Sequence, residues 1–188
     1  MLDVALKEWA VICDLLAEGS LAFLLRKGGI FEDHGPGRFR LEYDRFALFP
    51  AWEHQRPERI KPAYRARVQV FDHEPEQITI GAIGHAVKLW QVPGRAAFDQ
   101  LEDLHPWEPE QIDMRFNYKP ERPLYLVAVR AYRLPRPVTI ANGDTYAGCR
   151  SWVDLNAGDE VDDTGAEPVL SDGAFGELLV RMQAAMQG

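Results

Sequence analysis

The sequence has few of the motifs that identify an enzyme class. Its 188 residues include two cysteines, Cys13 and Cys149, which lack the spacing of a zinc site or a disulfide framework. No GxGxxG or GxxxxGKS/T pattern opens a helix after a strand, and no Gly-x-Ser-x-Gly turn is present to carry a nucleophile. A phosphate loop, a dinucleotide site and a serine nucleophile are therefore not predicted, and no cofactor is indicated.

Long apolar runs are also missing. No apolar stretch approaches the roughly 18 residues of a membrane span, and no charged segment followed by an apolar one opens the chain. We therefore expect a cytoplasmic protein without a membrane partner. Chains of this length usually fold as one unit, so we expect residues 1–188 to form a single domain.

Positive charge is scarce overall, with a net charge of −8, but it is unevenly distributed. Residues 151–172 hold seven carboxylates and no Lys or Arg, which leaves −1 for the rest of the chain. Residues 56–67 and 115–136 are rich in Lys and Arg, with one glutamate each. Such segments either contact the phosphates of DNA or RNA or form ordinary solvated surfaces.

The hydrophobic pattern predicts helices near both ends of the chain with strands between them. Apolar residues at spacings of three and four predict a helix over residues 2–17, and Ser171 is placed to cap a last helix. Strands are predicted at residues 21–25, 38–43, 46–49, 68–71, 78–92 and 124–133. The expected fold is α+β or mixed α/β, with a central, mostly antiparallel or mixed sheet and helices at both termini.

Glu8 is an acidic residue in an apolar setting. On a helix over residues 2–17 it lies inside the apolar arc, where a carboxylate needs a partner or a raised pKa. Two interpretations are open, a structural ion pair with an arginine and a site carboxylate at the edge of the core.

The stretch from Phe46 to Gln55 is the strongest candidate for a site. Pro50 has no N–H for a ladder, so Glu53, His54 and Gln55 are expected where a strand meets a loop. Scaffolds commonly present functional side chains at such places.

Three segments together resemble a known bacterial family. They are Ala5-Leu-Lys-Glu-Trp-Ala-Val11, Leu25-Arg-Lys-Gly-Gly-Ile30 and Leu48-Phe-Pro-x-x-Glu-His-Gln55, and the chain resembles the domain of unknown function 1802 over most of its length. The family has no established activity. Its occasional association with restriction-type nuclease domains implies a link to DNA modification and restriction, and the resemblance assigns no catalytic residue.

One hypothesis is a metal-dependent nuclease similar to the PD-(D/E)xK superfamily. Asp44 and Glu53 would hold Mg²⁺, Gln55 would help to place the attacking water, and Glu8 would supply a further acid. Gln55 stands where that pattern usually has lysine, and Pro50 interrupts the strand that should carry the pair.

The other hypothesis, which we favour, is a binding module for nucleic acid or a modified nucleotide. Trp52, Trp107, Tyr118 or Tyr125 would stack on a base, and His54 and Gln55 would hydrogen-bond its edge. The candidate cationic contacts are Arg26, Lys27, Arg56 and Arg59. A third possibility is an interaction protein without a small ligand. In either ligand-binding case we expect Glu8 to lie close to Glu53 or His54.

Overall fold

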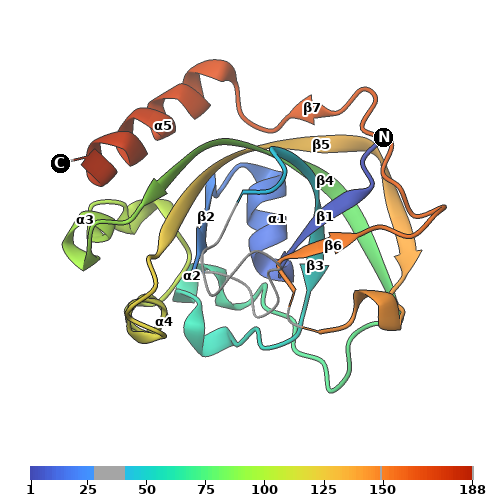
Figure 1. Cartoon of the computed structure of the whole chain (residues 1–188), viewed down its shortest axis with the longest axis horizontal. Coiled ribbons are helices and arrows are strands. Elements are labelled where there is room, and N and C mark those ends of the chain that lie inside the picture. The colour runs from blue at the N-terminus through green and yellow to red at the C-terminus, as the bar shows by residue number, and fades with distance from the viewer. Residues whose placement is uncertain (28–40, 149, 188) are drawn as a thin grey trace.

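The computed structural model describes residues 1–27, 41–148 and 150–187. In these residues, seven strands form one sheet with the order β2-β5-β4-β3-β1-β6, and β7 pairs with the middle of β5 at Tyr132 and Arg133 (Figure 1). The strands are β1 (Val4–Trp9), β2 (Phe23–Arg26), β3 (Arg45–Ala51), β4 (Gln77–Gln91), β5 (Tyr125–Ala141), β6 (Trp152–Asp154) and β7 (Glu167–Pro168).

Five α-helices and three short 3₁₀ turns accompany the sheet in the part of the chain described. The helices are α1 (Ala10–Glu18), α2 (Pro62–Arg65), α3 (Arg95–Asp99), α4 (Pro109–Asn117) and α5 (Asp172–Gln187). The 3₁₀ turns are η1 (Pro57–Arg59), η2 (Glu102–Leu104) and η3 (Asp144–Tyr146). Only β1 and β3 pair in parallel in this sheet, which confirms the predicted α+β fold with a mixed, mostly antiparallel sheet.

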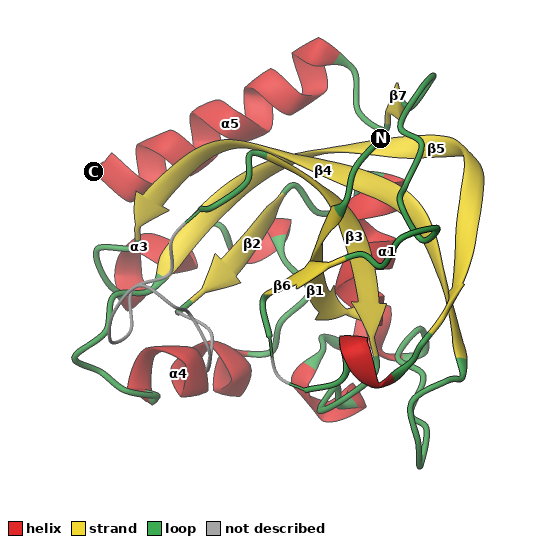
Figure 2. Ribbon diagram, turned by 45° about the vertical axis from the view of Figure 1, so that its right-hand side comes forward, coloured by secondary structure: helices red, strands yellow, loops and turns green. Residues whose placement is uncertain are grey.

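The two longest strands, β4 and β5, give the sheet its curvature. They arch over α1, which lies on the concave side of the sheet (Figures 1 and 2). The β4–β5 register shifts between Ile80 and Ala82 and again between Ala86 and Lys88, and such bulges bend a strand. Gly84 in β4 lies opposite Phe46 in β3. A Cβ atom at Gly84 would meet the Phe46 ring at 2.6 Å, so only glycine allows the ring to lie flat on the sheet.

The concave face buries most of α1. Residues such as Ile12, Leu15 and Leu16 pack there among apolar side chains of β2, β4 and β5. A second apolar cluster, centred on Phe49 and Tyr146, fills the other face of β1 and β3. The last helix, α5, begins as predicted, since the Ser171 hydroxyl accepts a hydrogen bond from the Ala174 N–H.

The helix predicted for residues 2–17 is wrong over its first half. Residues 4–9 form β1, which pairs with β3 on one side and β6 on the other, and the helix begins at Ala10. A strand buried on both faces carries apolar residues at all spacings, so part of its pattern matches a helical period.

Two predicted strands also differ from the structure. Residues 68–71 form an irregular segment, and residues 41–43 precede β3 without joining it, while residues 38–40 lie outside the described residues. The predicted strands at 21–25, 46–49, 78–92 and 124–133 correspond to β2, β3, β4 and β5.

Candidate functional site: an aromatic groove beside a buried ion-pair cluster

The polar triplet after Pro50 forms a sharp turn. The Gln55 N–H donates to the Trp52 carbonyl at 3.2 Å, and His54 adopts a left-handed backbone with φ of 63°. A non-glycine residue in that region is uncommon and is maintained only when its surroundings fix it.

Gln55 supplies one of those restraints from inside the protein. It is only 4% exposed, its Oε1 accepts from the Val11 N–H of α1 at 3.3 Å, and its Nε2 donates to the Gln69 carbonyl at 2.5 Å. This amide therefore holds the turn against both the first turn of α1 and the segment that precedes Val70. Its two hydrogen bonds engage both atoms of the Gln55 amide within the protein.

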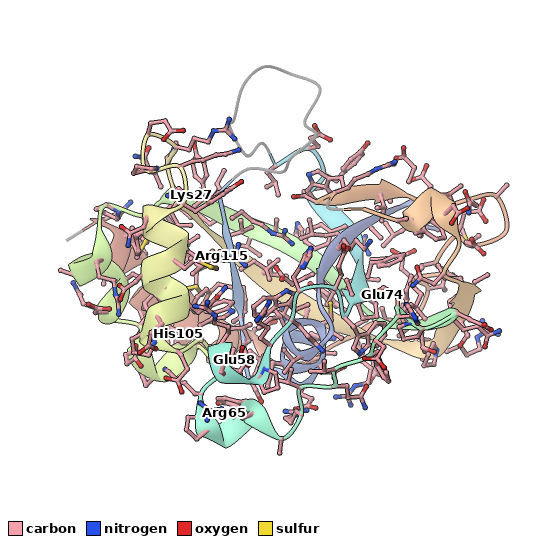
Figure 3. All side chains as sticks on the ribbon, turned by 90° about the horizontal axis from the view of Figure 1, so that it is seen from below. Lys27, Glu58, Arg65, Glu74, His105 and Arg115 are labelled. Carbon is pink, nitrogen blue, oxygen red and sulfur yellow. The ribbon has the colours of Figure 1, made fainter. Side chains whose placement is uncertain are left out.

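These contacts define an open groove of about 490 Å³, which we call the Trp52 groove. It lies between two segments, one after β3 and one before β4, and Glu58 and Glu74, labelled in Figure 3, come from these two segments. The residues lining it are Trp52, Glu53, His54, Gln55, Arg56, Pro57, Glu58, Val70, Phe71, Asp72, His73 and Glu74.

Two aromatic rings form the apolar part of the groove. The Trp52 and Phe71 rings have centroids 5.9 Å apart and planes inclined by 70°. Phe71 is 49% exposed and the neighbouring Val70 is 62% exposed, so this apolar surface faces solvent. Trp52 is partly buried against the second apolar cluster, so most of the solvent-exposed aromatic surface of the groove belongs to Phe71.

The charge of the groove is negative. Its lining contains four carboxylates, from Glu53, Glu58, Asp72 and Glu74, and Arg56 as the single Lys or Arg. Glu74 is held beside the Trp52 backbone, because its Oε1 accepts from the Trp52 N–H at 3.0 Å. The groove is therefore suited to neutral or cationic groups and disfavours phosphate.

Glu8 lies next to this region but belongs to a different cluster. It pairs with Pro50 in the parallel β1–β3 register, yet its Oε2 lies 3.1 Å from Arg26 Nη2, and their side chains are 7% and 12% exposed. Arg26 also donates to the Lys7 carbonyl at 2.8 Å. It thereby connects β2 to β1, two strands that are not neighbours in the sheet.

Helix α4 contributes one further cation, Arg115, to this Glu8–Arg26 cluster. Burial of its guanidinium lowers the pKa of Arg115, whereas the nearby Glu8 raises it. Lys27 donates to the Arg115 and Phe116 carbonyls at 2.9 and 2.6 Å, and Figure 3 shows Lys27 and Arg115 together beside α4. A lysine at these last carbonyls stabilises the helix end. Glu8 thus has the buried arginine partner of the structural interpretation, and the groove lining does not include it.

The two carboxylates of the nuclease hypothesis lie at opposite ends of one strand. Asp44 precedes β3 and Glu53 follows it, and the seven residues between Arg45 and Ala51 span about 20 Å at the usual rise. One Mg²⁺ cannot bind both side chains at that separation. In the described ranges, no group of three His, Cys, Asp or Glu side chains is arranged to hold a metal ion.

Cys13 does not offer a nucleophile either. Burial raises the pKa of its thiol well above the usual value, and the neighbouring Glu8 carboxylate raises it further. The thiol donates to the Glu8 carbonyl at 3.7 Å. A thiol held neutral in this way is structural.

Most basic side chains of residues 56–67 and 115–136 are engaged within the protein. Seven of them pair with carboxylates: Arg56 with Glu58, Lys61 with Glu102, Arg65 with Glu108, Arg67 with Glu18, Arg122 with Glu121, Arg130 with Asp172 and Arg136 with Asp162. Arg56 lines the groove 3.7 Å from Glu58, and Arg59 follows at the end of η1. A continuous basic surface is therefore not formed by these two segments.

Sequence patterns did not identify Phe71, Asp72, His73, Glu74 or Arg115 as site residues. The first four lie on a segment distant in sequence that meets Trp52 through the Phe71 ring, the Glu74 carboxylate and the Gln55–Gln69 hydrogen bond, and Arg115 reaches Glu8 from another element. The one local signal in the sequence was Phe71, an aromatic residue followed by the acidic residues Asp72 and Glu74.

No helix in the described parts of the chain is long and apolar enough to cross a membrane. No curated protein sequence matches the chain. A mutant of the ASCH protein ZmASCH from Zymomonas mobilis has a similar solved structure, with a TM-score of 0.45 and 9% identity, covering 83% of this chain and 92% of that one. The model of the family described as domain of unknown function (DUF1802) matches residues 5–181, so the chain belongs to this family.

Proposed function

We propose that the protein is a binding module for nucleotides, single or within nucleic acid, and that the Trp52 groove receives the base. The observation that carries this proposal is the pair formed by the partly buried Trp52 ring and the exposed Phe71 ring inside a groove of about 490 Å³. Ligand sites commonly have volumes of about 300–1,000 Å³ with mainly aromatic and apolar linings and a few polar groups. Base stacking on such a ring contributes about 1–3 kcal/mol.

Polar groups beside the rings are suited to the edge of a base. The exposed His54 and the Glu53 carboxylate lie next to Trp52, and their side chains approach each other at 3.4 Å. Glu74 and His73 stand in the opposite segment. Carboxylates accept hydrogen bonds from exocyclic amino groups, whereas imidazole nitrogens accept or donate, so together they can read a base edge.

Phosphate contacts have a small part in this mode of binding. Arg56 lines the groove and Arg59 is close to it in sequence, while most other arginines nearby are paired with carboxylates. Binding of an oligonucleotide should therefore release only about one or two counterions, a shallow salt dependence.

The test is titration of nucleosides and short single-stranded oligonucleotides, followed by tryptophan fluorescence and calorimetry. Phe71→Ala should weaken binding about tenfold, in line with the loss of one stacking partner. Tyr118→Ala is the matched control, because Tyr118 is also an exposed aromatic, at 51%, and does not line the groove. The proposal fails if no nucleoside or oligonucleotide binds more tightly than about 1 mM.

The same titration separates binding from nuclease activity. A binding module keeps its affinity in excess chelator and leaves the oligonucleotide intact with Mg²⁺. Cleavage that requires Mg²⁺ and disappears in Glu53→Ala would instead support catalysis.

A further inference from the structure

We propose that the Trp52 groove selects a positively charged, N-alkylated nucleobase over its neutral parent. This inference rests on the proposed function, since it names the class of base that the groove prefers. Two features of the groove support it, an excess of carboxylates and a pair of steeply inclined aromatic rings. A neutral base would make no use of the first.

The carboxylates come from both sides of the groove. Glu53 and Glu58 lie in the segment after β3, and Asp72 and Glu74 lie in the segment before β4, with Arg56 as the one Lys or Arg of the lining. Three negative charges therefore remain after Arg56 is counted, with the histidines neutral. A cation placed between these segments is attracted from both sides, and partial removal of water strengthens that attraction.

The rings supply a second attraction for the same charge. The face of a tryptophan or phenylalanine ring is electron-rich and attracts a cation within about 6 Å of its centroid. The Glu74 carboxylate is held at Trp52 by the backbone N–H of that residue, at 3.0 Å. A delocalised cation stacked on Trp52 would therefore contact a ring face and lie close to a fixed carboxylate.

The inclination of the rings favours a substituted base. Because the planes of Trp52 and Phe71 meet at 70°, a planar base can stack on one ring only, and its edge is directed toward the other. A methyl group on a ring nitrogen projects from that edge. It would pack against the second ring, where an unsubstituted base would leave apolar surface wet.

Other ligand classes fit less well. Phosphate and carboxylate ligands meet four carboxylates and one arginine in this groove. A divalent metal ion needs several oxygen or nitrogen ligands at once, and no metal-ligand cluster is present in the described residues. A neutral base can stack, but it lacks the electrostatic contribution.

The experiment compares two isomers of methylated adenosine with adenosine itself. 1-Methyladenosine is cationic near neutral pH, whereas N6-methyladenosine is neutral and carries the same methyl group on an exocyclic nitrogen. We expect 1-methyladenosine to bind about tenfold more tightly than either neutral nucleoside. Tetramethylammonium, a cation without a planar ring, should bind far more weakly than 1-methyladenosine.

Two variants test the carboxylates directly. Glu74→Gln retains an acceptor for the Trp52 N–H, and Asp72→Asn is nearly isosteric, so both should keep the shape of the groove. Each should lower the affinity for 1-methyladenosine several-fold and that for N6-methyladenosine by a much smaller factor, because only the cation loses a charge–charge attraction. Glu177→Gln, an exposed carboxylate on α5 outside the groove, is the control and should alter neither affinity.

The outcomes separate this inference from the proposed function. Equal affinity for the two isomers would overturn the preference for a cation and leave nucleotide binding in place. Absence of binding by all three nucleosides would overturn both. Tetramethylammonium binding as tight as that of 1-methyladenosine would overturn the requirement for a base.

Discussion

The Glu8–Arg26 cluster and the Trp52 groove are neighbours with opposite relations to water. Glu8 faces Pro50 in the β1–β3 register, and Glu53 follows three residues later on the same chain segment. The Glu8 and Arg26 side chains are 7% and 12% exposed, whereas those of Glu53 and His54 are 40% and 70% exposed. Where water is excluded, each charge must be paired within the protein. Where water remains, charged side chains are solvated and can exchange water for a ligand.

The largest expected effect is on the buried side of this comparison. Arg26→Met removes the cation that faces Glu8 and leaves a buried carboxylate, so the free energy of unfolding should fall by about 3–5 kcal/mol. Urea denaturation measures this change. Arg136→Met is the control, since the Arg136 side chain is 85% exposed and 3.6 Å from Asp162, and its effect should stay within about 0.5 kcal/mol.

A second variant keeps the Arg26 prediction informative. In the double variant Glu8→Gln with Arg26→Met, the unpaired charge is gone, so part of the lost stability should return. A loss below about 1 kcal/mol in Arg26→Met alone would contradict a structural role for the pair. It would place Glu8 among the residues free to act on a ligand.

The next largest effect on stability is expected for a buried histidine, His105. The His105 side chain is fully buried and stacked on Phe98 at 4.9 Å, and burial lowers its pKa from 6.5 to about 4, with Lys61 adding to the effect. Between these pH values the unfolded chain binds a proton that the folded protein excludes. Stability should therefore fall as the pH is lowered from 6.5 toward 4, by up to about 1.4 kcal/mol per pH unit.

His105→Phe isolates this contribution from that of the carboxylates. Unfolding free energies at pH 7 and at pH 4.5 should differ less in the variant than in the wild type, because the proton-binding group is gone. Parallel pH profiles for the two proteins would show that His105 does not titrate in this way.

A smaller effect is expected where the two regions are joined. Gln55→Ala leaves the Val11 N–H and the Gln69 carbonyl without their partner, which should cost about 1–3 kcal/mol and also weaken nucleoside binding by loosening the groove. Gln100→Ala, at an exposed glutamine, should change neither quantity. Unchanged nucleoside affinity in Gln55→Ala would show that the groove keeps its shape without this amide.

The smallest effect on stability belongs to the open side. Phe71 is 49% exposed, so Phe71→Ala should lower the free energy of unfolding by about 1 kcal/mol or less while it weakens nucleoside binding. Thermal and urea unfolding of the variant test this. A loss of 3 kcal/mol, typical of a core phenylalanine, would assign the ring to the core instead of the groove.

Glu8 shows how a sequence prediction can be right for a wrong reason. Its burial was predicted from a helical pattern, but residues 4–9 form a strand in which Glu8 lies on the same face as Leu6. Both geometries place it against apolar neighbours. The burial pattern of a short apolar segment is thus easier to predict than its backbone conformation, because strand pairing is decided by distant residues.

The nuclease hypothesis shows the opposite case. The spacing of Asp44 and Glu53 matches a metal pair on two adjacent strands, and this match depends on a turn between them. The structure has one continuous strand there, so the same spacing separates the carboxylates. Spacing alone cannot distinguish these arrangements. Whether the chain turns or continues as one strand is decided by pairing with β1 and β4, which are distant in sequence.

The sequence by itself determined the α+β fold class, most of the central strands, and the end of a strand just after Pro50, because strand periodicity and the missing proline N–H are local properties. Only the tertiary structure decided which charged side chains are paired in the interior and which lie at the solvent-exposed surface. Arg26 reaches Glu8 across strands that do not pair, and the Phe71 segment reaches Trp52 through the Gln55 amide. Such contacts depend on how a curved sheet closes around α1, which no short stretch of sequence specifies.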